Sequence, residues 1–347
     1  MLNNETIAAI ATPPGTGGIG VVRVSGKKTR IIAKHIIDGL PPKRTAVIRT
    51  FVNGAGEALD SGLAVYFQGP NSYTGEDVLE LQGHGGPGVL RLILRACIDA
   101  GARLAEPGEF TKRAYLNSKL DLAQAESVAD LIGASSEAAV LSAHRSLSGE
   151  FSTRTEQIKK ELIEARVFVE AAIDFSEEEI DFLKDESVKD RLNGVHLSLV
   201  QLREQATQGN LLREGAKVVL AGEPNVGKST LMNRLSEEET SIVTQYAGTT
   251  RDSIERQIIV GGMPMLIIDT AGLRRSDDPI ESMGIQRTLD HLKDADVIVD
   301  IREAGSDLGA RASMPHFAEN KSIVVFNKID LKGQSASLNE RGGIPAV

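Results

Sequence analysis

The sequence contains a single cysteine, Cys97, which excludes an internal disulfide and any cysteine-rich metal site. Cys97 ends a stretch, residues 89–97, with helical periodicity, so we expect a buried packing thiol. No apolar run approaches the roughly 20 residues that a membrane-spanning helix needs. The N-terminus also lacks the basic-then-apolar order of a signal peptide. These absences predict a cytoplasmic protein that does not enter a membrane.

An excess of positive charge is also lacking. The 347 residues carry 39 Lys and Arg against 48 Asp and Glu, a formal net charge of −9. This balance argues against a broad basic face for nucleic acid. Residues 1–118 are slightly basic, so the remainder is strongly acidic. Contacts with phosphate groups are therefore expected in the N-terminal part or on a partner.

Proline is absent between Gly108 and Glu223, although the chain has 12 prolines. Within this gap, apolar residues recur at steps of mainly three or four over residues 144–172, which predicts one long helix. A second amphipathic stretch, residues 188–212, predicts a helix that pairs with the first.

The length and these patterns predict a multidomain protein. Residues 1–118 combine short β-rich runs with Gly and Pro turns, which is typical of an α/β or α+β domain. Residues 119–214 form the predicted α-helical central domain. Residues 215–347 alternate strand and helix, as an α/β P-loop G domain requires. Gly15-Thr-Gly-Gly-Ile-Gly20 matches G-x-G-x-x-G, but β-branched residues follow, so we expect a strand and no dinucleotide site.

A phosphate-binding motif follows the β-like run at residues 217–221. Residues 222–229 read Gly-Glu-Pro-Asn-Val-Gly-Lys-Ser and match G-x-x-x-x-G-K-[ST]. Backbone N–H groups of such a loop point at phosphate oxygens, and the following helix adds its dipole. Lys228 would reach the β- and γ-phosphates, and the Ser229 hydroxyl would hold Mg²⁺. The residues predicted to surround the phosphates are Asn225, Val226, Gly227, Lys228, Ser229 and Thr230.

The segment Asn327-Lys328-Ile329-Asp330 predicts which base is bound. A carboxylate at Asp330 can accept hydrogen bonds from guanine N1–H and the 2-amino group together. Adenine offers no such pair of donors. The sequence therefore predicts a GTP-binding protein.

Two further segments complete the predicted GTPase site. Residues 248–252 read Gly-Thr-Thr-Arg-Asp, and Thr250 would be the second protein ligand of Mg²⁺, ordered only while the γ-phosphate is present. A strand at 265–269 would deliver Asp269 to the Mg²⁺ second shell, with the Gly272 amide near the γ-phosphate. Leu273 occupies the position of the glutamine that orients water in Ras-type proteins. Glu281 and Asp277, which follow on the same segment, are candidates to replace it. The predicted catalytic residues are Lys228, Thr250, Asp269 and Glu281.

Several longer motifs resemble the tRNA-modification GTPase family MnmE, also called TrmE, over nearly the whole chain. The N-terminal motifs are specific to that family rather than to GTPases at large. The motifs lie at residues 6–15, 72–77, 84–86, 107–114, 117–126 and 247–252.

The resemblance implies an N-terminal domain that forms a homodimer and binds a tetrahydrofolate derivative such as 5-formyltetrahydrofolate. Its contacts would include Arg23, Glu80 and Lys119. Arg and Lys suit the carboxylates of the folate glutamate, and a carboxylate suits the pterin donors. For each residue taken alone, a surface salt bridge is the commoner role.

The resemblance also implies a K⁺ ion beside the phosphates, where an arginine finger would otherwise place its charge. Its ligands would be Asn225, Thr244, the Tyr246 backbone and Thr249, and the threonines would also border GTP. Glu281 matches the family glutamate that positions water. Hydrolysis would be coupled to pairing of two G domains. The implied reaction adds a carboxymethylaminomethyl or aminomethyl group to C5 of the wobble uridine of certain tRNAs. The resemblance implies that an FAD-dependent partner of the MnmG (GidA) type takes part in this reaction.

The chain departs from the family pattern near its end. The last strand and closing helix of a G domain, the second helical portion and the C-terminal tail are not in the sequence, so we expect a fragment or a truncated chain with an unpaired sheet edge. Two alternatives to a modification enzyme stay open from the residues. One is a regulatory or ribosome-assembly GTPase switch, and the other is a folate-binding scaffold with a crippled G domain.

Overall fold

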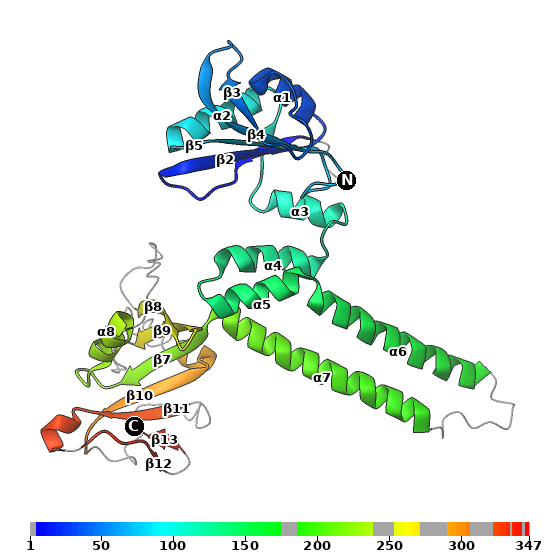
Figure 1. The fold of residues 1–347 in the computed structure, drawn as a ribbon. Coiled ribbons are helices and arrows are strands. Elements are labelled where there is room, and N and C mark those ends of the chain that lie inside the picture. The colour runs from blue at the N-terminus through cyan, green and yellow to red at the C-terminus, as the bar shows by residue number, and fades with distance from the viewer. Residues whose placement is uncertain are drawn as a thin grey trace, which may run out of the picture. The chain divides into compact units, whose positions relative to one another are not determined.

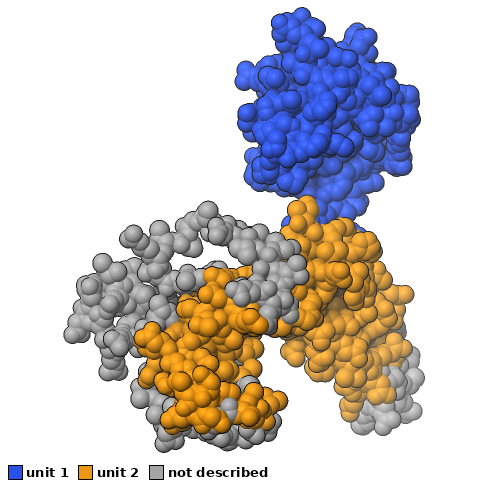
Figure 2. Space-filling view, turned by 60° about the vertical axis from the view of Figure 1, so that its left-hand side comes forward, with its two compact units in different colours: residues 1–129 blue, residues 130–347 orange. Residues whose placement is uncertain are grey.

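The computed structural model describes residues 5–174, 186–238, 253–270, 290–305, 322–333, 335–341 and 344–346. They fall into two compact units, residues 1–129 and 130–347 (Figure 2). The first unit extends beyond residue 118, where the sequence suggested a boundary. Among the described residues, no helix is both long and apolar enough to cross a membrane.

The first unit is built on a six-stranded sheet with the order β3-β4-β5-β2-β1-β6 (Figure 1). All neighbouring strands are antiparallel except β1 and β6, which are parallel. Its strands are β1 (Ile7–Ile10), β2 (Gly17–Ser25), β3 (Val47–Val52), β4 (Ala58–Phe67), β5 (Val78–Gly85) and β6 (Arg103–Leu104). Its helices are α1 (Thr29–Ile37), α2 (Pro87–Asp99), α3 (Glu109–Leu116) and most of α4 (Leu122–Gly133).

Helix α2 packs against this sheet through one apolar face. Pro87 occupies the first turn, where a missing N–H costs nothing. Leu90, Ile93 and Cys97 follow at helical spacing and are buried in the core beside Val22 and Leu81. Burial raises the pKa of the Cys97 thiol to about 12. The prediction of a buried packing thiol is confirmed.

The glycine-rich segment of residues 15–20 leads into strand β2, as expected. A Cβ on Gly20 would lie 2.5 Å from Leu90 Cδ1, so glycine is needed there for helix α2 to approach the sheet. Because no helix follows this segment, it is not a dinucleotide-binding turn.

The helical part of the second unit contains α5 (Glu137–Leu147), α6 (Glu150–Asp174) and α7 (Glu186–Glu214). Helices α6 and α7 pack side by side (Figure 1). The prediction of one helix over 144–172 is wrong at its start, because α5 ends at Leu147 and α6 begins at Glu150. Gly149 between them has a φ of +86°, a left-handed conformation that ends a helix and that glycine adopts without strain.

The remainder of the second unit is a seven-stranded sheet with the order β12-β13-β11-β10-β7-β9-β8. Strands β13, β11, β10, β7 and β9 run parallel, and β8 and β12 pair antiparallel at the two edges. Strand β13 pairs with β11 at Ala346 and Val324, and β12 is the edge strand on this side of the sheet. The strands are β7 (Ala216–Gly222), β8 (Ser253–Val260), β9 (Met263–Thr270), β10 (Val297–Glu303), β11 (Ser322–Asn327), β12 (Asn339–Arg341) and β13 (Ile344–Ala346).

This parallel arrangement agrees with the predicted α/β P-loop domain. Helix α8 (Lys228–Glu238) follows β7, and the 3₁₀ helix η3 (Ile329–Lys332) follows β11. The carboxyl ends of parallel strands meet at one edge of a sheet, where open α/β folds place their ligands. Strands β7, β9 and β11 therefore carry their C-terminal residues to a common edge.

Candidate nucleotide and folate sites

The phosphate-binding loop leaves the C-terminal end of strand β7 and enters helix α8. Gly222 and Gly227 have φ values of +143° and +105°. A Cβ on Gly222 would lie 2.2 Å from the Ile301 carbonyl oxygen. Asn225 also has a positive φ, 65°, and is exposed. The turn thus demands glycine at both ends and brings the N-terminus of α8 to the sheet edge, where an anion is favoured.

The Lys228 ammonium lies across this loop. Its Nζ donates hydrogen bonds to the carbonyl oxygens of Gly222 and Glu223, each at 2.9 Å. Burial lowers the pKa of Lys228, while the negative charge of Asp269 opposes that shift. An ammonium has three donors, so one remains for a phosphate oxygen. Lys228 is therefore held across the loop, and its contact with the phosphates stays a prediction.

Ser229 and Asp269 form the part of the site that fits Mg²⁺. The Ser229 hydroxyl donates to Asp269 Oδ2 at 3.1 Å, which joins the start of α8 to the end of β9. Asp269 is only 8% exposed, and its buried Oδ1 has no hydrogen-bond partner among the described residues. Mg²⁺ prefers carboxylate and hydroxyl oxygens, with phosphates and waters as its other ligands. A buried carboxylate oxygen without a donor beside a phosphate-binding loop suits that ion.

Strand β11 connects the guanine motif to the phosphate loop. The Asn327 side-chain amide donates to the Val226 carbonyl oxygen at 2.7 Å. Lys328 has a φ of 60° and lies 3.7 Å from Glu303. Asp330 is exposed in η3, where its carboxylate is accessible to a base. The structure therefore brings Asn327 into direct contact with the loop that holds Lys228, and Thr230 follows in the first turn of α8.

Several predicted residues lie outside the described residues. They are Thr244, Tyr246, Thr249, Thr250, Gly272 and Glu281. Their roles stay predictions, and of the predicted K⁺ ligands only Asn225 is described.

In the first unit, Arg23 and Glu80 form an ion pair between β2 and β5. Arg23 Nη2 and Nε lie 2.8 and 2.9 Å from Glu80 Oε1, and no described residue donates to Glu80 Oε2. The Arg23 guanidinium lies 5.6 Å from the ring centroids of both Tyr73 and Phe110, a cation–π distance. A planar charged group and a free carboxylate oxygen beside two aromatic rings suit a pteridine.

Lys119, the third predicted folate residue, follows helix α3. It lines an open hollow of about 490 Å³ together with Tyr115, Leu116, Ser118, Leu120, Asp121 and Gln124. A Cβ on Gly75 would lie 3.3 Å from Lys119 Cγ, so the stem of Lys119 passes close to the segment of residues 69–77 that also carries Tyr73. Sequence reasoning missed Tyr73 and Phe110, although both lie in motifs that carry the family resemblance.

Comparisons with known proteins decide the family. The model described as "GTP-binding protein TrmE N-terminus" matches residues 6–119, and "MnmE helical domain" matches residues 122–345. A protein named tRNA modification GTPase MnmE from Chromobacterium violaceum is 53% identical over 99% of this chain and 77% of its own length. One of the same name from Saccharophagus degradans is 52% identical over 96% of this chain and 75% of its own.

The chain belongs to the MnmE family of tRNA modification GTPases. An MnmE from Nitrosomonas europaea is 50% identical over all of this chain and 78% of its own length. Among solved structures, the G domain of the T. maritima FeoB iron transporter is 25% identical over 35% of this chain and 77% of its own, with a TM-score of 0.28.

Beside the candidate folate site of this MnmE-family chain, Glu109 lies in a buried ion network. Hydrogen bonds from Arg103, above all, and from the Glu106 backbone and Arg113 lower the Glu109 pKa from 4.5 to about 2, although burial acts in the opposite direction. A lowered folded-state pKa adds stability that is present above pH 4.5 and is lost as the pH falls through about 2. The stabilisation amounts to roughly 3 kcal/mol at neutral pH.

We therefore expect Glu109→Gln to destabilise the first unit by roughly 3 kcal/mol at pH 7, with a difference from the unchanged chain that narrows toward pH 2. Urea titrations read out by hydrogen-exchange labelling of β5 peptides measure this difference at each pH. Glu57→Gln, at an exposed turn, is the matched control and is expected to change stability little. A difference for Glu109→Gln that stays constant across this range would contradict the assigned role of the charge.

Proposed function

We propose that this chain is a GTP-hydrolysing enzyme of tRNA modification that acts in the cytoplasm. The observation that carries the proposal is the arrangement of Lys228, Ser229, Asp269 and Asn327 around one loop at the carboxyl edge of a parallel sheet. Each has the chemistry needed for phosphate, Mg²⁺ or guanine. Family membership favours a modification enzyme over the regulatory GTPase that the G motifs alone allowed.

In the proposed hydrolysis, the chain positions GTP and neutralises its charge. The loop N–H groups and Lys228 would hold the β- and γ-phosphates, and Asp330 would hold guanine. Ser229 and Thr250 would be direct ligands of Mg²⁺, and Asp269 would lie in its second shell. The ion would neutralise negative charge on the phosphates. Gly272 would contact the γ-phosphate through its backbone, and Glu281 would orient the attacking water.

A monovalent cation is proposed to take the place of an arginine finger. Asn225, exposed in the loop at a positive φ, would contribute one oxygen ligand to K⁺. The other proposed ligands are Thr244, the Tyr246 backbone and Thr249. K⁺ would supply a positive charge beside the phosphates as negative charge develops. We propose that this arrangement forms when two G domains of a homodimer pair.

The first unit is proposed to bind a tetrahydrofolate such as 5-formyltetrahydrofolate. Glu80 Oε2 would accept hydrogen bonds from the pterin amino and ring N–H groups, while Arg23 holds the carboxylate in place through Oε1. Lys119 would pair with a glutamate carboxylate of the folate. The one-carbon unit would be used, with an FAD-dependent partner of the MnmG type, to build an aminomethyl or carboxymethylaminomethyl group on C5 of the wobble uridine of tRNA.

The first test compares GTP hydrolysis in KCl and in NaCl at equal ionic strength. We expect rates several-fold higher in K⁺ and expect Lys228→Met to lower the rate by at least about 10²-fold, because it removes a charge that contacts the phosphates. Lys293→Met, at an exposed lysine of the same domain, is the control and should hydrolyse GTP normally. Equal rates in both salts would contradict the K⁺ proposal, and full activity of Lys228→Met would contradict the assigned site.

A further inference from the structure

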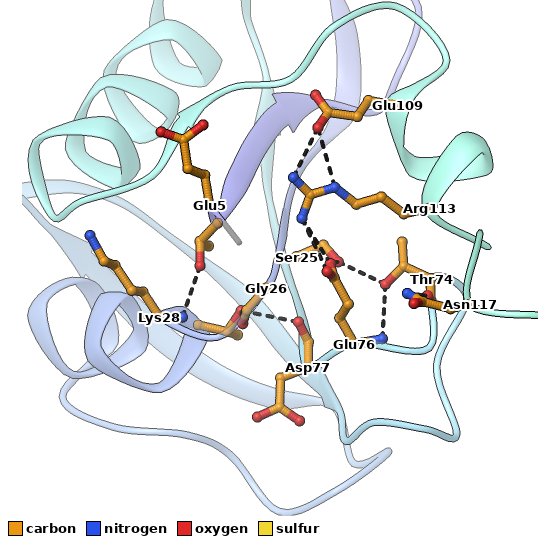
Figure 3. A network of polar contacts seen from close by, with 12 residues as sticks. Glu5, Ser25, Gly26, Lys28, Thr74, Glu76, Asp77, Glu109, Arg113 and Asn117 are labelled. Carbon is orange, nitrogen blue, oxygen red and sulfur yellow. Dashed lines mark hydrogen bonds and ion pairs between the residues drawn. The ribbon is translucent and has the colours of Figure 1, made fainter. Parts of the chain in front are cut away.

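A buried ion network in the first unit ties helix α3 to the segment of residues 69–77 (Figure 3). The Arg113 side chain, 5% exposed, donates from Nη2 and Nε to Glu109 Oε1 at 2.9 and 3.2 Å. Its Nη1 donates to Glu76 Oε2 and Oε1 at 3.0 and 3.2 Å. One guanidinium therefore joins a carboxylate of α3 to a carboxylate of the 69–77 segment.

The same segment is held from two other elements. Ser25, at the end of β2, donates to Glu76 Oε2 at 2.7 Å and shares a hydrogen bond of 2.7 Å with the Thr74 hydroxyl. Asn117, after α3, donates from Nδ2 to the Thr74 carbonyl oxygen, also at 2.7 Å. Figure 3 shows these side chains converging on Thr74 and Glu76. The backbone on either side of Gly75 is thus fixed by side chains from three directions.

The residues adjacent to this network carry the aromatic rings of the candidate folate site. Tyr73 precedes Thr74, and Phe110 follows Glu109. Both rings lie over the Arg23 guanidinium, and the Tyr73 hydroxyl shares a hydrogen bond of 2.8 Å with Thr111 on α3. The network therefore fixes the two backbone segments from which the rings project.

Stability alone is a weak reason for such a network. Removing one partner of a buried ion pair is destabilising, but the whole pair contributes little net free energy compared with apolar residues of similar volume, because both charges lose their hydration. Directional hydrogen bonds between charged groups do fix geometry, in a way that apolar contacts do not. The network is therefore better suited to fixing the relative positions of helix α3 and residues 69–77 than to adding stability.

We propose that Glu76 and Arg113 are positioning residues of the folate site. They hold Tyr73 and Phe110 over Arg23, so that the Arg23–Glu80 pair presents Glu80 Oε2 to a flat pteridine in a fixed orientation. This inference rests on the proposed folate function and assigns a task to two residues that do not themselves touch the ligand.

The test is the affinity of the full chain for 5-formyltetrahydrofolate, measured by titration calorimetry. Glu76→Gln keeps the shape of the side chain but removes its charge, and the Arg113–Glu109 pair remains. We expect its affinity to fall about tenfold or more, as is common when a residue that orients a binding group is changed. Thr111→Val, a milder change that removes the partner of the Tyr73 hydroxyl, is expected to give an intermediate loss. Glu57→Gln is the control and should bind as the unchanged chain does.

A second readout separates positioning from stability. The chain has no tryptophan, so Tyr73→Trp introduces a single tryptophan, whose emission can be excited selectively, at the position next to Arg23. We expect Glu76→Gln in that background to shift the emission to longer wavelength and to increase quenching by acrylamide at temperatures well below its thermal midpoint, where the first unit is folded. Normal folate affinity in both Glu76→Gln and Thr111→Val would overturn the inference. Absence of folate binding by the unchanged chain would instead overturn the folate proposal, and this inference with it.

Discussion

Asp330→Asn is expected to exchange the preferred nucleotide from GTP to xanthosine triphosphate. The Asp330 carboxylate accepts two hydrogen bonds from guanine in the proposed site, and each bond to a charged group contributes about 1.5–3 kcal/mol. Losing both would weaken GTP binding by roughly 10²- to 10⁴-fold. An amide at this position can instead donate to the second carbonyl oxygen of xanthine, which restores the pairing.

Competition of unlabelled nucleotides against a fluorescent GDP analogue measures this exchange. Asp294→Asn is the matched control, since Asp294 is exposed and precedes the amino end of β10, whereas the guanine motif follows the carboxyl end of the parallel strand β11. We expect it to keep the original preference. Unchanged selectivity for guanine in Asp330→Asn would show that the base is recognised elsewhere.

Gly227→Ala is expected to abolish tight GTP binding. A Cβ on Gly227 would lie 2.1 Å from Asn327 Nδ2, and the φ of +105° is unfavourable for any residue with a side chain. The backbone strain costs about 1–2 kcal/mol. The contact also forces Asn327 away from Val226, which separates the guanine motif from the phosphate loop. The backbone strain in the phosphate loop and the displacement of Asn327 would both weaken the binding of GTP.

Gly261→Ala provides a control that also places alanine at a positive φ, at a smaller backbone cost and with no collision. Gly261 has a φ of +58° in the turn between β8 and β9, and nothing lies within 4 Å of its added Cβ. We expect this variant to lose some thermal stability and to bind GTP normally. Nucleotide titration of both variants compares them directly. Equal GTP affinities in the two would mean that the Gly227–Asn327 contact is unimportant for the site.

In the candidate nucleotide site, the parts that the sequence predicted are those with a local spacing rule. The phosphate loop is one turn between a strand and a helix, so the positions of Gly227 and Lys228 follow from the pattern itself. The base preference could likewise be inferred from the four-residue motif Asn327–Asp330, because a carboxylate in this motif accepts the two hydrogen bonds that guanine donates. The alternation of strand and helix after residue 215 gave the correct fold for the same reason.

The parts that were missed depend on contacts between distant segments. Arg113 meets Glu76 across 37 positions of sequence, and no periodicity links the two. Tyr73 and Phe110 converge on Arg23 only because the sheet and helix α3 are already folded. The break after Leu147 was missed because the apolar spacing continues across Gly149, and the left-handed turn leaves that spacing intact.

The burial of Cys97 has a practical consequence for spectroscopy. Its thiol is fully buried, and its raised pKa leaves almost no thiolate at neutral pH, so it reacts slowly with maleimides and nitroxide reagents. Cysteines introduced at exposed positions of the two compact units can therefore be labelled selectively without first replacing the native one. Distances between spin labels or dyes, measured without nucleotide and during GTP hydrolysis, would then test whether the separation of the two units changes.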